Sequence, residues 1–178
     1  MTAQQRELLI YNGNEYHLAS EPFNQYIYKN KIDLRLEVPI TSLWRGYYGH
    51  WEITDNKLYL TKIEGQGVIR NQEKYKAGRL ALRKKCRAGL ITPQQNGHLL
   101  KELENACLEK IKLSLKSLFN TRKKVHASWY TGNIIAPYGK LVQYIHIGYA
   151  SVYERQLIFQ IEDGVLLNVV DQETPPEA

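Results

Sequence analysis

The sequence predicts an α+β domain, in which an antiparallel sheet or a partly open β-barrel has two central helices packed against it. Residues 6–65 and 124–170 contain short runs that alternate apolar and polar side chains, the period of two typical of strands. Residues 70–119 instead space their apolar side chains as helices do. Strands followed by two helices and then strands again favour the α+β class. We expect residues 1–170 to form one domain and residues 171–178 a disordered tail.

Length and composition indicate a globular protein. The chain has 178 residues, of which 43% are apolar and 24% charged. No apolar run approaches the roughly 18 residues of a membrane span, and the start lacks a secretory signal pattern, so a cytoplasmic protein is expected. Cys86 and Cys107 lack the CxxC spacing of metal and redox sites, which predicts reduced thiols, no metal and no cofactor.

The first β section contains two predicted hairpins. Asn12-Gly13 is a strong turn signal between two short strands, and a second turn is expected at Asp55-Asn56. Residues 21–30 read either as a short helix or as an irregular crossing, and residues 31–38 as a half-buried strand. With Asp55 and Asn56 as turn residues, Trp51 faces Leu60 on a buried side and His50 faces Thr61. The other side of this hairpin then carries a polar and aromatic set, His50, Glu52, Tyr59 and Thr61.

The helical section predicts two helices. The first ends near Gly89, and its apolar stripe is thin. The second is expected over residues 92–119, where an apolar repeat from Leu99 to Leu118 predicts one continuous helix.

The last β section contains five short runs, and Asp163-Gly164 predicts a hairpin turn between the last two. Alternation places His126 and Tyr130 on one face of residues 124–132, and Tyr144 and His146 on one face of residues 140–148.

A polar and aromatic surface is the first predicted site. Tyrosine supplies most of the aromatic residues, and its ring can stack on a ligand while its hydroxyl bonds to it. If the two β sections pack side by side, one ligand-binding cleft would contain Arg45, Tyr47, Tyr144, His146, Tyr149 and Tyr153. A structural ion pair is the alternative for Arg45.

Two histidine and carboxylate pairs are weak catalytic candidates. His146 with Glu154, or His50 with Glu52, could act as a general base with its orienting carboxylate. The alternative is that each histidine lies at the surface or is hydrogen-bonded in the core.

Charge is concentrated in the helical section. Residues 70–124 carry 15 Lys and Arg against 4 Asp and Glu, a net charge of +11, whereas the remainder carries 9 against 14, a net charge of −5. Such a block attracts nucleic acid, acidic lipid or an acidic protein face, unless it is only a solvated face. The predicted nucleic-acid contacts are Lys74, Arg79, Arg83, Lys84, Lys85 and Arg87.

Two separated segments, "WRGYYGHWEITDNKLYL" and "HIGYASVYE", resemble those of a family of small uncharacterised bacterial proteins. The resemblance covers both β sections and implies a bacterial origin, but no activity. From the polar and aromatic surface, the expected function is a module that binds a protein or a small polar ligand. A nucleic-acid-binding accessory protein and a small hydrolase or transferase are the alternatives.

Overall fold

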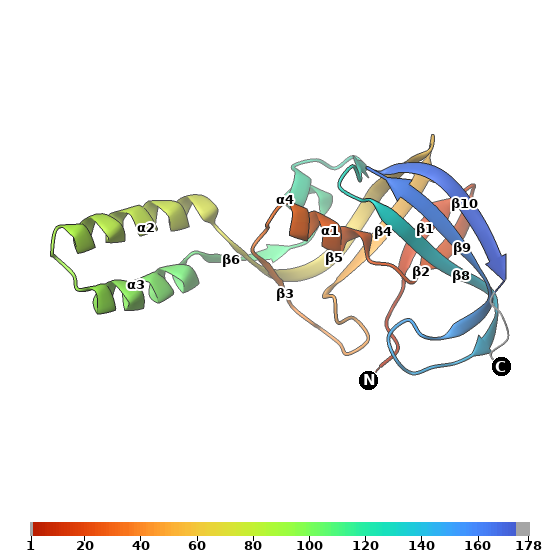
Figure 1. Ribbon diagram of the computed structural model, residues 1–178, viewed down its shortest axis with the longest axis horizontal. Coiled ribbons are helices and arrows are strands. Elements are labelled where there is room, and N and C mark those ends of the chain that lie inside the picture. The colour runs from red at the N-terminus through yellow and green to blue at the C-terminus, as the bar shows by residue number, and fades with distance from the viewer. Residues whose placement is uncertain (1, 174–178) are drawn as a thin grey trace.

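The computed structural model describes residues 2–173 and has an α+β fold, which confirms the predicted class (Figure 1). Its 10-stranded sheet is mostly antiparallel and not closed, with the main strand order β2-β1-β4-β5-β10-β9-β8. The short strands β3, β6 and β7 pair with β5. The elements are β1 (Glu7–Tyr11), β2 (Asn14–Leu18), α1 (Pro22–Lys29), β3 (Leu34–Leu36), β4 (Tyr47–Thr54), β5 (Lys57–Arg70), α2 (Gln72–Arg87), α3 (Pro93–Ala106), β6 (Leu108–Lys112), α4 (Leu115–Phe119), β7 (Val125–His126), β8 (Gly132–Gln143), β9 (Val152–Glu162) and β10 (Val165–Glu173).

The three predicted hairpin turns are confirmed. Each contains residues with positive φ, as the tight turns between antiparallel strands require. Between β4 and β5, Trp51 lies opposite Leu60 and both side chains are buried. Beyond this pair a bulge shifts the register, so His50 lies opposite Lys62 and the predicted pairing with Thr61 is wrong.

The core combines buried side chains of the sheet with Phe23 of α1. Residues 21–30 contain the helix α1, with Pro22 in its first turn and Phe23 buried. The ring of Phe23 packs edge-on against Tyr47 at a centroid distance of 5.2 Å. Trp51 and Phe159 complete the set of large aromatic side chains with no exposed surface.

The prediction of one helix from residue 92 to residue 119 is wrong. The helix α3 ends at Ala106, and the chain continues as β6, which pairs antiparallel with the end of β5. Ile111 fits a helix through its four-residue step to Leu115 and a strand through its alternation with Leu113, and strand pairing satisfies the backbone of both strands. Leu113 is consequently almost completely buried at the end of β6.

The helices α2 and α3 form a hairpin that extends away from the body of the sheet (Figure 1). They pack mainly on each other, with Leu103 lying directly against Gly78, and neither helix has a buried residue. Their packing against the sheet is confined to the base, where Lys74 Nζ lies 2.9 Å from Glu109 Oε1 of β6. Among residues 2–173, no helix combines the length and apolar character that crossing a membrane requires.

The last β section differs from the prediction in three details. Residues 133–139 and 140–143, expected in separate strands, belong to one strand, β8, which ends before residues 144–148. Because β7 has only two residues, the alternation stops there and Tyr130 is buried instead of sharing the face of His126. β10 continues to Glu173, past the predicted boundary at residue 170, and residues 174–178 of the predicted tail lie outside the described residues.

Candidate functional site

The N-terminal segment, residues 2–6, joins the two β sections. Gln5 N–H donates to Ser42 O, and Gln4 N–H donates to Gly148 O, each at 2.8 Å. Since side chains alternate along an extended chain, Arg6 and Glu7 leave this segment on opposite sides. Arg6 faces the tyrosines of the last β section, and Glu7 enters the core.

Arg6 is surrounded by aromatic rings. Its guanidinium carbon lies 5.2 Å from the ring centroid of Tyr153 and 5.7 Å from that of Tyr149. Nη2 donates to Tyr149 O at 3.3 Å, while Nη1 is buried without a hydrogen-bond partner among residues 2–173. Burial lowers the pKa of Arg6, but arginine stays charged at neutral pH. One nitrogen of a charged guanidinium therefore stays without an acceptor among the described residues.

An open hollow of about 370 Å³ lies at Arg6, between the N-terminal segment and residues 141–153. Tyrosine rings and polar side chains form much of its wall, a combination able to stack on a ligand and hydrogen-bond to it. The polar side chains on the wall are Gln4, Arg6, His17, Tyr144, Ser151 and Tyr153.

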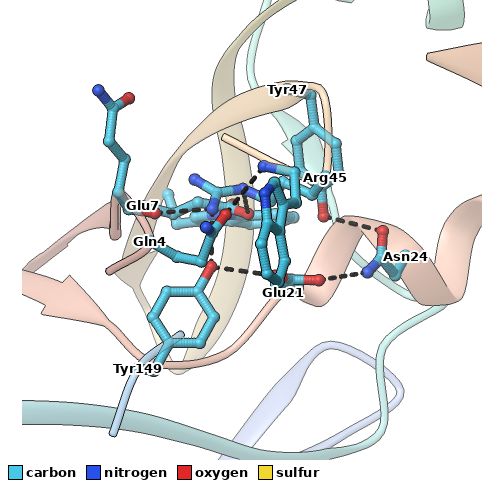
Figure 2. Close-up of polar contacts among 10 residues, drawn as sticks. Gln4, Glu7, Glu21, Asn24, Arg45, Tyr47 and Tyr149 are labelled. Carbon is cyan, nitrogen blue, oxygen red and sulfur yellow. Dashed lines mark hydrogen bonds and ion pairs between the residues drawn. The ribbon is translucent and has the colours of Figure 1, made fainter. Parts of the chain in front are cut away.

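Tyr149 connects Arg6 to a polar network inside the fold (Figure 2). Its hydroxyl accepts from Arg45 Nη1 at 2.7 Å and donates to Glu21 Oε1 at 3.0 Å. Asn24 Nδ2 donates to Glu21 Oε2 at 2.6 Å, and Tyr47 donates to Asn24 Oδ1 at 3.1 Å. This network fixes the position of the ring that lies beneath Arg6.

Glu7 and Arg45 form a buried ion pair at the centre of the network. Glu7 Oε1 lies 3.1 Å from Arg45 Nε, and the side chains are 0% and 2% exposed. Trp51 Nε1 donates to Glu7 Oε2 at 2.6 Å, and Arg45 Nη1 also donates to Gln5 O. A side chain at residue 49 would collide with the Glu7 carboxyl group, so Gly49 leaves room for it.

The protonation of Glu7 is governed mainly by its burial. Burial raises the pKa of Glu7 to about 7, against the opposing effects of the Trp51 hydrogen bond and the Arg45 charge. Burial likewise raises the pKa of Tyr149, so its hydroxyl stays protonated at neutral pH and can donate to Glu21.

The structure brings part of the predicted ligand set together. Tyr144 and Tyr153 line the hollow, and Tyr149 lies beside Arg6. Arg45 and Tyr47, by contrast, are buried in the interior. Arg45 forms an ion pair with Glu7, which agrees with the alternative interpretation of this residue. His146 is exposed, with Nδ1 2.8 Å from the hydroxyl of Tyr144.

The predicted pairs of histidine and carboxylate have other partners. His50 Nε2 lies 3.4 Å from Glu64 Oε2 rather than against Glu52, whose carboxylate binds Lys124. The carboxylate of Glu154 accepts the backbone N–H of Lys140. His50 and Glu52 are two residues apart on one strand, whereas Glu64 lies on the adjacent strand, which explains the partner of His50.

Arg6, Glu7 and His17 are site residues that the sequence analysis did not select. Glu7 could have been found, because it shares a strand face with Leu9 and Tyr11 and would be the charged member of an otherwise apolar face. Arg6 could not, since its position depends on the pairing of residues 2–6 with residues 42 and 148.

Within residues 2–173, no group of three or more His, Cys, Asp or Glu side chains is placed to hold a metal ion. Comparison with protein-family models, with curated proteins and with solved structures finds no match for the chain. The resemblance carried by the two aromatic segments therefore stays a prediction.

Proposed function

We propose that this protein is a cytoplasmic bacterial binding module that takes a small anionic ligand, a carboxylate or a phosphate, in the hollow at Arg6. The observation that carries the proposal is Arg6 Nη1, a buried cationic donor without a partner among the described residues. A buried donor without an acceptor destabilises the protein, and an anion would satisfy it.

The surroundings of Arg6 favour an anion with an apolar part. Its planar guanidinium matches the geometry of carboxylate and phosphate oxygens. Tyr144 and Tyr153 add hydroxyl groups that can donate to the same ligand, and their rings can pack on its apolar part. The volume of the hollow lies in the range of small-molecule sites.

The test is a calorimetric titration of the whole chain with benzoate, with benzamide as an uncharged compound of the same shape, and with inorganic phosphate. We expect an anion to bind and benzamide not to bind. Arg6→Gln should weaken the binding of that anion at least about tenfold, because a hydrogen bond to a charged group is lost. The affinity of Arg6→Lys for this anion should lie between those of the wild type and Arg6→Gln, since lysine retains the charge without the planar guanidinium group.

Arg35→Gln is the matched control, because Arg35 is largely exposed and lies outside the hollow. Circular dichroism spectra should show that each variant folds. Tyr153→Phe is a second variant that retains the ring and removes only its hydroxyl group. If neither anion binds the wild-type chain, or Arg6→Gln binds as well as the wild type, the proposal is wrong.

A further inference from the structure

The helical hairpin presents a line of cations that the proposed ligand site does not use. Lys76, Arg79, Arg83 and Arg87 follow one another at three- and four-residue steps along α2, so they share one face of the helix. With a rise of about 1.5 Å per residue, they extend over roughly 16 Å. Lys76, Arg79 and Arg83 also line an open groove of about 420 Å³ between α2 and α3, together with Leu80, Asn96 and Leu100.

These charges are not neutralised locally. α2 carries seven Lys and Arg and one acidic residue, Glu73. Within the part of the chain that the structure describes, Lys74 is paired with Glu109, whereas Lys76, Arg83 and Arg87 form no ion pair. Arg79 lies over the ring of Tyr75 at 5.7 Å, and Glu104 on α3 accepts the hydroxyl of Tyr75.

None of these four cations is buried in the fold. α2 and α3 extend beyond the sheet, and neither helix contributes a buried residue (Figure 1). The face of α2 at Gly78 is covered by Leu103 of α3, so the cationic face is left to solvent.

From this arrangement we propose that the face of α2 formed by Lys76, Arg79, Arg83 and Arg87 binds the phosphate backbone of double-stranded nucleic acid, independently of base sequence. A duplex offers a dense line of negative charge, and each Lys or Arg that neutralises a phosphate releases counterions. An α-helix with its side chains has a diameter of about 10–12 Å, comparable with the major groove of B-DNA. Because the hairpin extends away from the sheet, α2 can approach a groove while the sheet stays clear of the duplex (Figure 1).

Two other partners fit the hairpin less well. A helix that lies on a membrane surface needs a broad apolar face, but Leu80 and Leu90 are the only large apolar side chains above one-third exposed in residues 71–107. A second copy of the chain would bring two faces of the same positive charge together, which repel each other.

The test compares the whole chain with two double variants by fluorescence anisotropy, using mixed-sequence duplex DNA and duplex RNA of equal length. Lys76→Glu with Arg83→Glu should weaken binding to unrelated sequences alike, by at least about tenfold at low salt. The slope of log K against log salt concentration should become shallower by about two, since two phosphate contacts are lost.

Lys29→Glu with Lys31→Glu is the matched control, because it makes the same change of charge at exposed residues outside the hairpin. This control should bind nearly as the wild type does. Stronger binding to one duplex identifies the preferred nucleic acid. The proposal fails if neither duplex binds at about 50 mM salt, where phosphate contacts are strong. It also fails if both variants lose affinity equally, or if only vesicles of anionic lipid bind.

Discussion

At the scale of single residues, the ion pair of Glu7 and Arg45 organises the interior behind the candidate site. A buried charge destabilises a fold unless partners surround it, and here both groups have several. Arg45 lies between the rings of Tyr47 and Tyr48, at 5.5 and 5.9 Å, and bonds to Tyr149. Tyr149 in turn lies beside Arg6, so the buried pair and the ligand site share one ring.

The raised pKa of Glu7 predicts a pH dependence of stability. Its pKa is about 7 in the folded chain against an ordinary value of 4.5, so the folded state holds the proton more tightly than the unfolded state. Between pH 4.5 and pH 7 the unfolded state has lost this proton while the folded state retains it. The free energy of unfolding should therefore fall as pH rises through this range, by about 3 kcal/mol, and become level above it.

Urea titrations of the wild type and of Glu7→Gln at a series of pH values test this prediction. The amide in the variant can still accept from Trp51, but it does not titrate. The difference between the two curves isolates Glu7 from the other titrating groups. Parallel curves from pH 4.5 to pH 7 would show that Glu7 does not titrate there.

At the scale of elements, β5 and β6 form a hairpin whose connection is the pair of helices α2 and α3. Arg70 lies opposite Leu108, and Asn71 N–H donates to Cys107 O at 2.8 Å. The two ends of the helical hairpin are therefore already held together as neighbouring strand residues. We therefore infer that the helical hairpin is an insertion that the sheet does not need in order to fold.

Replacing residues 72–106 with Asn-Gly should leave the sheet folded. The variant loses the solvent-exposed pair of Lys74 with Glu109, which contributes little to stability in water, and no buried side chain. We expect a free energy of unfolding within about 2 kcal/mol of the wild type, since the stacking of Arg70 on Tyr75 is also lost. Circular dichroism should show the loss of helix, and urea titration measures the stability.

Leu113→Ala in the full chain provides the contrast for this deletion. Leu113 is buried at the end of β6, so its truncation should cost about 2–5 kcal/mol. A deletion variant that fails to fold, or that loses more stability than Leu113→Ala, would contradict the description of the hairpin as an insertion.

The same elements show what the sequence could predict. Local signals fixed the turns at Asn12-Gly13, Asp55-Asn56 and Asp163-Gly164, because positive φ depends on the turn residues themselves. The division of residues 107–119 was missed, since Ile111 continues the helical spacing to Leu115 but also alternates with Leu113 as in a strand, and pairing with β5 decides between them. The bulge beside Trp51 has no signal in the pattern either.

At the scale of the whole molecule, the site depends on segments that are far apart in the sequence. Residues 2–6 lie between residues 42 and 148 and so bring the first and last β sections together. The aromatic character of residues 144–153 was predictable from the sequence. For Arg45 the sequence left two interpretations, a ligand contact and an ion pair, and the structure has the ion pair. That Arg6 rather than Arg45 faces the hollow follows only from this long-range pairing.

The two proposed binding surfaces are separate from each other. The hollow at Arg6 lies between the N-terminal segment and residues 141–153, whereas the cations of α2 lie on the hairpin beyond the sheet (Figure 1). Because the two surfaces share no residue, changes at one should leave binding at the other intact.

Whether an anion binds at Arg6 is tested most directly by tyrosine-ring NMR shifts during an anion titration. With ¹³C-labelled tyrosine rings assigned by single Tyr→Phe variants, benzoate or phosphate should shift Tyr144, Tyr149 and Tyr153, which line or adjoin the hollow. Tyr130, buried elsewhere in the core, and Tyr75 on α2 should stay unchanged. Shifts at Tyr75 without shifts at Tyr153, or no shift at any of the three, would contradict binding at Arg6.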